Sequence, residues 1–208
     1  MRGAFTDFLQ DTPTAGAFRA WRFGEGNRGA CDLIQLESVR RGRANRGKVV
    51  VIEDASNRSD VAFCRVIPGK WKNATSNSPT AFVVQIDFAD FERVIGDERA
   101  LEAFNVGWGL LHELDHIAND SPDAVSLGEK GECEAHINQM RRECNLPERA
   151  DYFSTLLPGT ADSTFPTRLV RLAFEQRQPE ANKKKRYWVI WDANVVGGLE
   201  QNQLAVLR

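Results

Sequence analysis

The sequence predicts an α+β fold in which strands come first and helices follow. Short segments rich in β-branched and aromatic residues fill the amino-terminal half, whereas apolar residues recur at three- and four-residue steps in the middle of the chain. Strands followed by helices are typical of α+β proteins. The chain has 208 residues, of which 42% are hydrophobic, so we expect one folded domain over 1–208, strand-rich in 1–95, helical in 96–150 and mixed in 151–208.

Three segments predict the strands of a mixed or antiparallel sheet. They read KVVVIED, VAFCRVI and AFVVQIDF, at 48–54, 61–67 and 81–88, and turn-rich sequence separates them. We expect the third segment to form an edge of the sheet, where it can pair with an extended peptide.

Two helices are predicted next. Asp97 is a candidate N-cap, and apolar residues at helical spacing follow it to about residue 118. A second helix is predicted over 129–144, ending where Asn145 can adopt a left-handed conformation. In the carboxy-terminal third, 168–176 is expected to be helical and 186–193 a strand.

Composition excludes several classes of protein. The net charge is −2 and the pI about 6.0, which disfavours binding to nucleic acid or to an anionic membrane surface. No apolar stretch reaches the roughly 18 residues that a spanning helix needs, and Asp7 and Asp11 interrupt the region where a signal peptide would be apolar. The sequence as written predicts a cytoplasmic protein, with export by a dedicated secretion system left open, and the oligomeric state is not predicted.

The segment GWGLLHELDHIAND contains two of the three histidines of the chain. On a helix, His112 and His116 are four residues apart and therefore point the same way, so both rings can reach one metal ion. Zinc accepts neutral imidazole nitrogen, and its catalytic sites use three protein ligands with a water in the fourth position. Glu113 lies about 100° round the helix axis from His112, beside the expected metal, where its carboxylate can accept a proton from water.

These residues carry a resemblance to a known family. The motif HELDH resembles the HExxH signature of the zincin metallopeptidases. The resemblance implies a zincin-like fold with an active-site helix and a second, ligand-bearing helix, with His112 and His116 as Zn²⁺ ligands and Glu113 as catalytic base. It implies a zinc metallopeptidase acting on a peptide or protein substrate.

A third zinc ligand is needed, and several residues are candidates. The metzincin position, six residues after His116, is Pro122, which disfavours that subclass. The segment GECEAHINQ resembles the ligand helix of the gluzincins, and on that resemblance Glu134 is the first choice. Glu132 and His136 are the alternatives, since zinc binds both carboxylate and imidazole.

The segment NQMRRECNLPERADY, from 138 to 152, resembles the tail that follows the metal motif in some bacterial effector-type and toxin-associated metallopeptidases. Tyr152 closes this segment. It can donate a hydrogen bond to an oxyanion, as tyrosines do in several zincins, or it can be a packing aromatic beside Phe153.

An alternative function belongs to a different class. The chain could be a non-catalytic binding module, with or without zinc, that contacts nucleic acid or a protein partner through its basic segments. These segments are VRRGRANRGK, at 39–48, and NKKKRYW, at 182–188.

Overall fold

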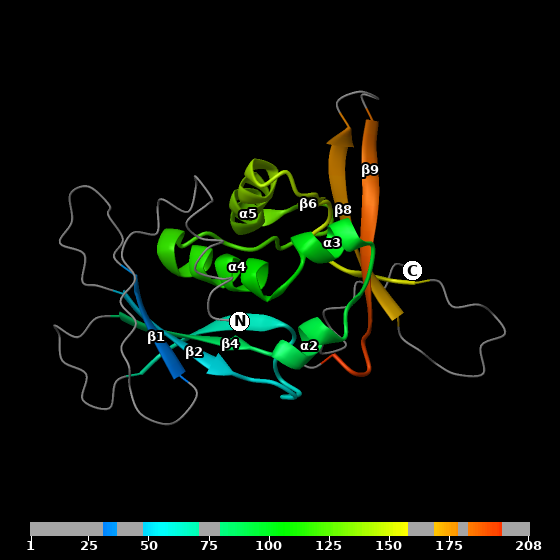
Figure 1. Ribbon diagram of the computed structural model, residues 1–208. Helices are drawn as coiled ribbons and strands as arrows, with labels where there is room; N and C mark the ends of the chain where they lie inside the picture. Colours follow the sequence, from blue (N-terminus) through cyan, green and yellow to red (C-terminus); the bar gives the residue numbers. More distant parts are fainter. Residues whose placement is uncertain (1–30, 37–47, 71–79, 158–168, 179–182, 197–208) are drawn as a thin grey trace, which may run out of the picture.

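The computed structural model describes residues 31–36, 48–70, 80–157, 169–178 and 183–196. These residues form two β-sheets with helices packed between and beside them, which confirms the α+β class (Figure 1). The expectation about a leader depends on residues 1–30, and nearly all of the first basic segment falls on residues 39–47. Both ranges lie outside the described residues.

The first sheet is mixed and comes from the amino-terminal half. Its strand order is β1 (Cys31–Leu36), β2 (Lys48–Asp54), β4 (Thr80–Ile86) and β3 (Cys64–Pro68). The β1–β2 and β3–β4 pairs are antiparallel, whereas β2 and β4 are parallel. Three of these strands cover the three predicted segments to within a few residues.

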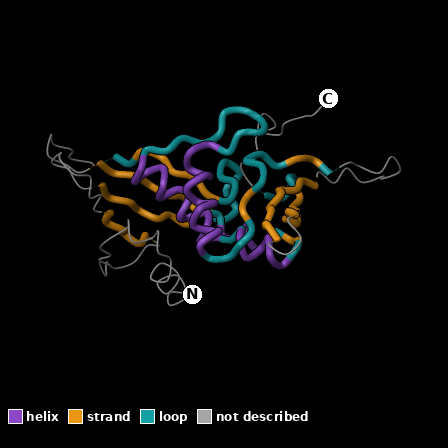
Figure 2. Tube along the Cα trace, turned by 90° about the horizontal axis from the view of Figure 1, so that it is seen from above, coloured by secondary structure: helices purple, strands orange, loops and turns teal. Residues whose placement is uncertain are grey.

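Helix α4 (Val106–Asn119) lies across this sheet and is covered on its other side by α5 (Gly131–Glu143) (Figures 1 and 2). One apolar side of α4 packs on β2 and β4; the buried residues there are Val50, Val84, Ile86, Leu110, Leu114 and Ile117. Another side meets α5 through Trp108, Leu111, Cys133, Ile137 and Met140. Because α4 is buried on two sides, the direction of its polar side chains is fixed.

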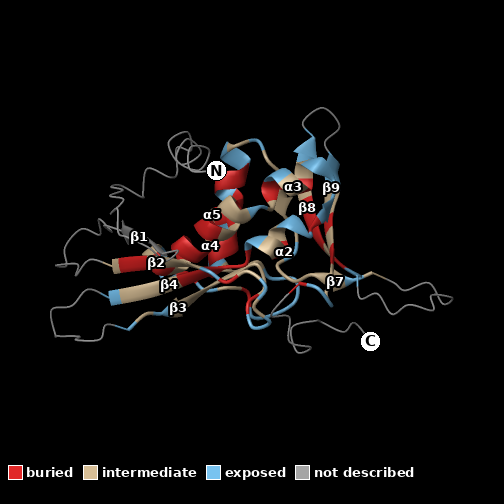
Figure 3. Cartoon of the chain, turned by 60° about the horizontal axis from the view of Figure 1, so that its bottom comes forward, coloured by how far each residue is buried: buried red, intermediate tan, exposed pale blue. Residues whose placement is uncertain are grey.

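The second sheet lies at the other end of the molecule and is built on a long hairpin (Figure 2). Strands β8 (Leu169–Gln178) and β9 (Lys183–Asp192) pair antiparallel along their whole length. Short strands flank them: β5 (Ile95–Gly96) beside β9, and β6 (Glu148–Arg149) and β7 (Thr155–Leu156) beside β8. Figure 3 shows that the far end of the hairpin is exposed, whereas buried residues gather where α3 (Glu98–Ala103) packs.

The prediction of a helix over 168–176 is wrong, because this segment forms β8. Its buried residues Val170, Leu172 and Phe174 alternate along the strand, a period of two. Ala173 is also buried, which extends the apolar run and gives it a helical appearance in the sequence. Pairing with β9, which includes the strand predicted over 186–193, decides the conformation.

The single helix predicted over 97–118 is divided into α3 and α4. Phe104 leaves the helical region, with φ −135° and ψ 87°, and Asn105 is extended. The side chain of Asn105 accepts hydrogen bonds from the backbone N–H groups of Gly107 and Trp108, so α4 begins with its own N-cap. The second helix is confirmed, and it ends as expected before Asn145, whose φ is 55°.

The expected edge strand is also different. Strand β4 lies between β2 and β3, so both of its edges are paired, and β1 and β3 are the strands at the two ends of the described sheet. The short helix α2 (Phe88–Glu92) follows β4 in the chain. None of the helices in the described ranges is long and apolar enough to cross a membrane.

Candidate metal centre

Helix α4 brings His112 and His116 together one turn apart. Their ring centroids are 4.8 Å apart and the rings are perpendicular. The helix ends immediately after this turn, because Asp120 has a left-handed conformation with φ 58° and its backbone N–H donates to the carbonyl of His116. The predicted pair is thus placed at the carboxy-terminal end of α4, where the chain turns back.

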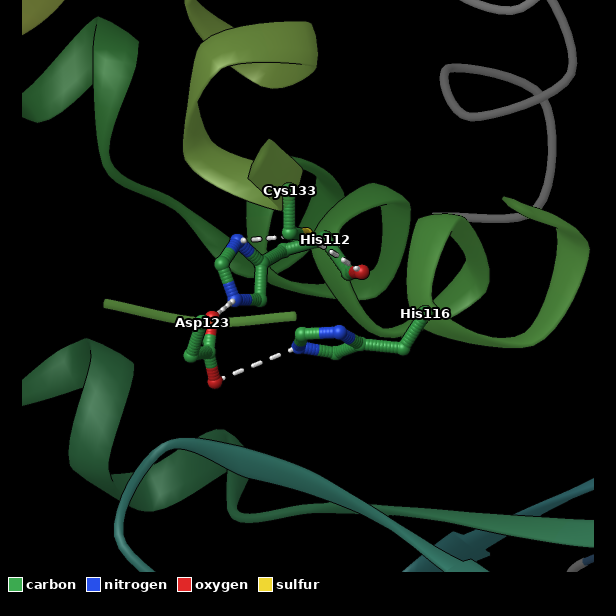
Figure 4. Close-up of side chains that lie close together, drawn as sticks. All are labelled: His112, His116, Asp123 and Cys133. Carbon is green, nitrogen blue, oxygen red and sulfur yellow. Dashed lines mark hydrogen bonds and ion pairs between the residues drawn. The ribbon is translucent and has the colours of Figure 1, made fainter. Parts of the chain in front are cut away.

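Both histidines direct Nε2 towards one carboxylate, that of Asp123 (Figure 4). Nε2 of His112 lies 3.0 Å from Oδ1 of Asp123, and Nε2 of His116 lies 3.3 Å from Oδ2. The Nδ1 atoms have other partners: that of His116 is 2.6 Å from the carbonyl oxygen of Ser121, and that of His112 is 3.4 Å from Sγ of Cys133. The two Nε2 atoms therefore converge on the same point with a carboxylate opposite them.

The loop that carries Asp123 is fixed to the beginning of α5. The carbonyl of Pro122 accepts hydrogen bonds from the backbone N–H groups of Glu132 and Cys133, which would otherwise be unpaired at the helix amino terminus. Asp123 itself forms a β-bridge with Gly131. Gly131 has φ 76°, and a Cβ there would lie 2.4 Å from the backbone nitrogen of Ala124, so this close approach requires glycine.

Glu134, the predicted third ligand, lies on the Nδ1 side of His112. Its Oε2 is 3.5 Å from Nδ1 of His112 and 3.2 Å from Nη1 of Arg149, and its Oε1 accepts from Arg141. The side chain is fully buried. Burial alone would raise the pKa of Glu134, but the two guanidinium groups lower it, so the carboxylate stays charged.

The two alternative ligands lie elsewhere. Glu132 is exposed on α5. His136 has its Nδ1 3.0 Å from Oδ2 of Asp115, a fully buried carboxylate on α4. The structure therefore brings neither residue to the two Nε2 atoms, and it pairs His136 with another acid.

Glu113, the predicted base, is buried between α4 and the edge strand β3. Only 6% of the residue is exposed, and its carboxylate accepts a hydrogen bond from the thiol of Cys64 on β3. Burial raises the pKa of Glu113, although the nearby His112 and His116 oppose the shift. A carboxylate with a raised pKa beside two imidazoles that could hold a metal is suited to accept a proton.

Tyr152 lies against the same centre. Its ring stacks on that of His112, with 6.2 Å between centroids, and its hydroxyl hydrogen-bonds Asp123. The guanidinium of Arg149 also lies over the Tyr152 ring, 4.7 Å from its centroid. Burial and the Asp123 charge raise the pKa of Tyr152, so the hydroxyl remains protonated and able to donate. Its ring also contacts Phe153 edge-on, as the packing alternative expected.

The hydrogen bond between Asp123 and His116 shifts the pKa values of these two side chains in opposite directions. This hydrogen bond raises the pKa of His116 to about 9. Burial alone would raise the pKa of Asp123, but the hydrogen bonds from His112 and His116 lower it far below its usual range. The carboxylate between the imidazoles is therefore an anion that a divalent cation can share with them.

Four residues place one possible ligand atom each within 4.8 Å of one another: His112, His116, Asp123 and Cys133. Sequence reasoning identified the two histidines but missed the acid. Asp123 is seven residues past His116, one beyond the metzincin position, and it follows the Asn-Asp-Ser-Pro turn. The available signal in the sequence was an acidic residue directly after the turn that ends the helix carrying HELDH.

Comparison of the chain with protein-family models, with curated proteins and with solved structures finds no significant match.

Proposed function

We propose that the protein is a zinc metallopeptidase of the HExxH type with a zincin-like arrangement of active-site helix and sheet. The observation that carries this proposal is the convergence of two imidazole Nε2 atoms on the Asp123 carboxylate, at 3.0 and 3.3 Å. Two nitrogens and one carboxylate oxygen, with a fourth position for water, form a typical catalytic zinc donor set.

The ligand set that we propose is His112, His116 and Asp123. Glu134 takes a different role from the one expected from the sequence. It lies at Nδ1 of His112, the nitrogen opposite the metal side, where metal-binding histidines commonly contact a carboxylate that fixes their orientation. Cys133 lies at the same Nδ1 atom, and for that reason we do not include its thiol among the ligands.

The proposed reaction uses the metal and two further residues. Zinc held at this site would lower the pKa of a bound water and polarise the scissile carbonyl. Glu113 accepts a proton from the attacking water and delivers it to the departing amide nitrogen. Tyr152, whose hydroxyl donates to Asp123 in this structure, would donate instead to the oxygen that develops negative charge.

The substrate is expected to lie along β3. This strand ends the described sheet, and through Cys64 it contacts Glu113 on α4. An extended peptide paired with β3 would lie beside the strand that contacts the base, whereas both edges of β4 are already paired.

The experiment is Glu113→Gln, which keeps the size of the side chain and removes its basicity. We expect hydrolysis of a peptide library to fall by about 10²-fold or more, because general base catalysis contributes about 10²–10⁴-fold, while zinc measured by mass spectrometry stays at the wild-type level. Glu132→Gln changes an exposed glutamate on α5 and is the matched control, with both properties unchanged.

Two results would reject the proposal in different ways. Full activity in Glu113→Gln would remove this residue from catalysis. Zinc binding by the wild-type protein, with no hydrolysis of any peptide in the library, would favour the non-catalytic module instead.

A further inference from the structure

The acid inside the motif, Asp115, has no role in the proposed reaction and yet is among the most buried polar groups of the described chain. It lies between the base and the second histidine in sequence, and its side chain points away from the metal side towards α5, where it meets His136. A buried carboxylate is retained only where donors satisfy it, so its partners indicate what it does.

Three side chains converge on this carboxylate. Asn119, in the last turn of α4, donates to Oδ1 at 2.6 Å. The hydroxyl of Ser121 donates to Oδ2, and Nδ1 of His136 on α5 lies 3.0 Å from the same oxygen. The three donors come from the end of α4, from the loop after it and from α5, so a single charge connects all three segments.

Ser121 connects this group to the metal centre. Its hydroxyl contacts Asp115, while its carbonyl oxygen is 2.6 Å from Nδ1 of His116. A ring nitrogen that faces a carbonyl is protonated, so in the neutral, metal-binding form of His116 the lone pair is left on Nε2, the nitrogen on the Asp123 side. The position of Ser121 therefore determines both the orientation and the tautomer of His116.

The same serine begins the segment that delivers the third ligand. Asp123 is two residues further on, and Pro122 between them accepts from the first turn of α5. Displacement of Ser121 would move the proposed ligand His116 through its Nδ1 contact. It would also move the proposed ligand Asp123 through the short backbone that joins the two residues. His136, which the sequence offered as a possible ligand, helps to hold the acid that fixes this loop.

We propose that Asp115 is a positioning residue of the metal centre, acting through Ser121 to orient His116 and to place Asp123. The proposal rests on the proposed zinc site. An uncharged amide such as Asn has only one accepting oxygen, so it could not accept from all three of these donors as the two carboxylate oxygens do.

The test uses Asp115→Asn and Ser121→Ala, with zinc affinity measured by competition with a chelating dye and the visible spectrum recorded with Co²⁺ in place of zinc. We expect zinc affinity about 10–100-fold weaker in both variants, the range typical of groups that orient metal ligands, and a changed Co²⁺ spectrum. If Asp115→Asn does not fold, Ser121→Ala, which removes one oxygen, carries the test.

Asp87→Asn is the matched control. Asp87 is equally buried and accepts backbone hydrogen bonds from Asn57 and Asp90, away from the metal centre. It should lose stability with zinc affinity and Co²⁺ spectrum unchanged. Wild-type affinity and spectrum in Asp115→Asn and Ser121→Ala would show that Asp115 is only structural, whereas a wild-type protein without affinity for zinc would reject the proposed function itself.

Discussion

At the scale of single residues, the direction of each histidine ring follows from what its Nδ1 atom contacts. In His116 that contact is the carbonyl of Ser121, and in His112 it is the pair formed by Cys133 and Glu134. With both Nδ1 atoms engaged, both Nε2 atoms turn to Asp123. In the proposed centre, the direction of the donor nitrogens is thus decided by neighbours outside the proposed ligand set.

Asp123 and Glu134 are expected to respond differently to substitution. Asp123→Ala should lower zinc affinity by more than about 100-fold, which exceeds the usual effect of a residue that only orients a ligand. Glu134→Gln should keep zinc at an affinity reduced about 10–100-fold, and should destabilise the fold by about 3–5 kcal/mol because Arg141 is left buried without its partner.

Chelator competition and urea unfolding measure the two effects separately. Loss of zinc from Glu134→Gln together with retention in Asp123→Ala would restore Glu134 as the ligand and contradict the assignment of Asp123.

At the residue scale, the local features of the site could be predicted from the sequence, whereas its non-local contacts could not. The spacing of His112, Glu113 and His116 on a helix is a local property, so it was readable from the sequence alone. The choice between Asp123 and Glu134 depends on how α5 packs against α4 and on the two arginines that neutralise Glu134. Such non-local contacts leave no periodic signal in the sequence.

At the scale of elements, the loop that connects α4 to α5 contributes as much to the geometry of the candidate site as the two helices do. Asp120 ends α4 in a left-handed conformation, and the β-bridge of Asp123 with Gly131 then fixes the loop to α5. The helices were predictable because each has an amphipathic pattern and a stop signal. The division at Asn105 was not, since the apolar spacing continues across it.

Gly131→Ala tests this connection. A Cβ at this position would lie 2.4 Å from the nitrogen of Ala124 and 2.6 Å from the carbonyl carbon of Asp123, so the loop must move. We expect weaker zinc binding, by about tenfold or more, together with a loss of stability of about 1–3 kcal/mol for a residue forced into an unfavourable backbone region.

Gly128→Ala is the control in the same loop. Gly128 also has a positive φ, 85°, but a Cβ there would meet nothing within 4 Å. It should lose a similar amount of stability from the backbone alone and keep its zinc affinity. Equal zinc affinities in the two variants would show that the bridge does not place Asp123.

At the scale of the whole molecule, three clusters of buried residues hold the described part of the fold, and α4, which carries the candidate metal centre, takes part in two of them. One cluster joins α4 to the first sheet, one joins α4 to α5, and one lies under the β8–β9 hairpin. The class of fold was predictable from the order of strand-like and helix-like segments. The order of strands was not, because β3 and β4 are both apolar and only their pairing shows which of the two lies at an edge of the described sheet.

Removal of zinc should lower stability without unfolding the protein, since these clusters do not depend on the metal. At free zinc 100-fold above its dissociation constant, binding to the folded state alone contributes about 2.7 kcal/mol. For a chain of this length we therefore expect a thermal midpoint about 5–10 °C lower in excess EDTA. Midpoints that coincide with and without zinc would contradict a metal centre formed by the folded state.

The most direct measurement is a crystal structure of the zinc-loaded protein, with anomalous scattering recorded at the zinc edge. We predict one peak bonded to Nε2 of His112 and of His116 at about 2.0–2.1 Å, and to a carboxylate oxygen of Asp123 at about 2.0–2.2 Å. A peak bonded to Glu134 or Cys133 in place of Asp123, or no peak between the two histidines, would contradict the account.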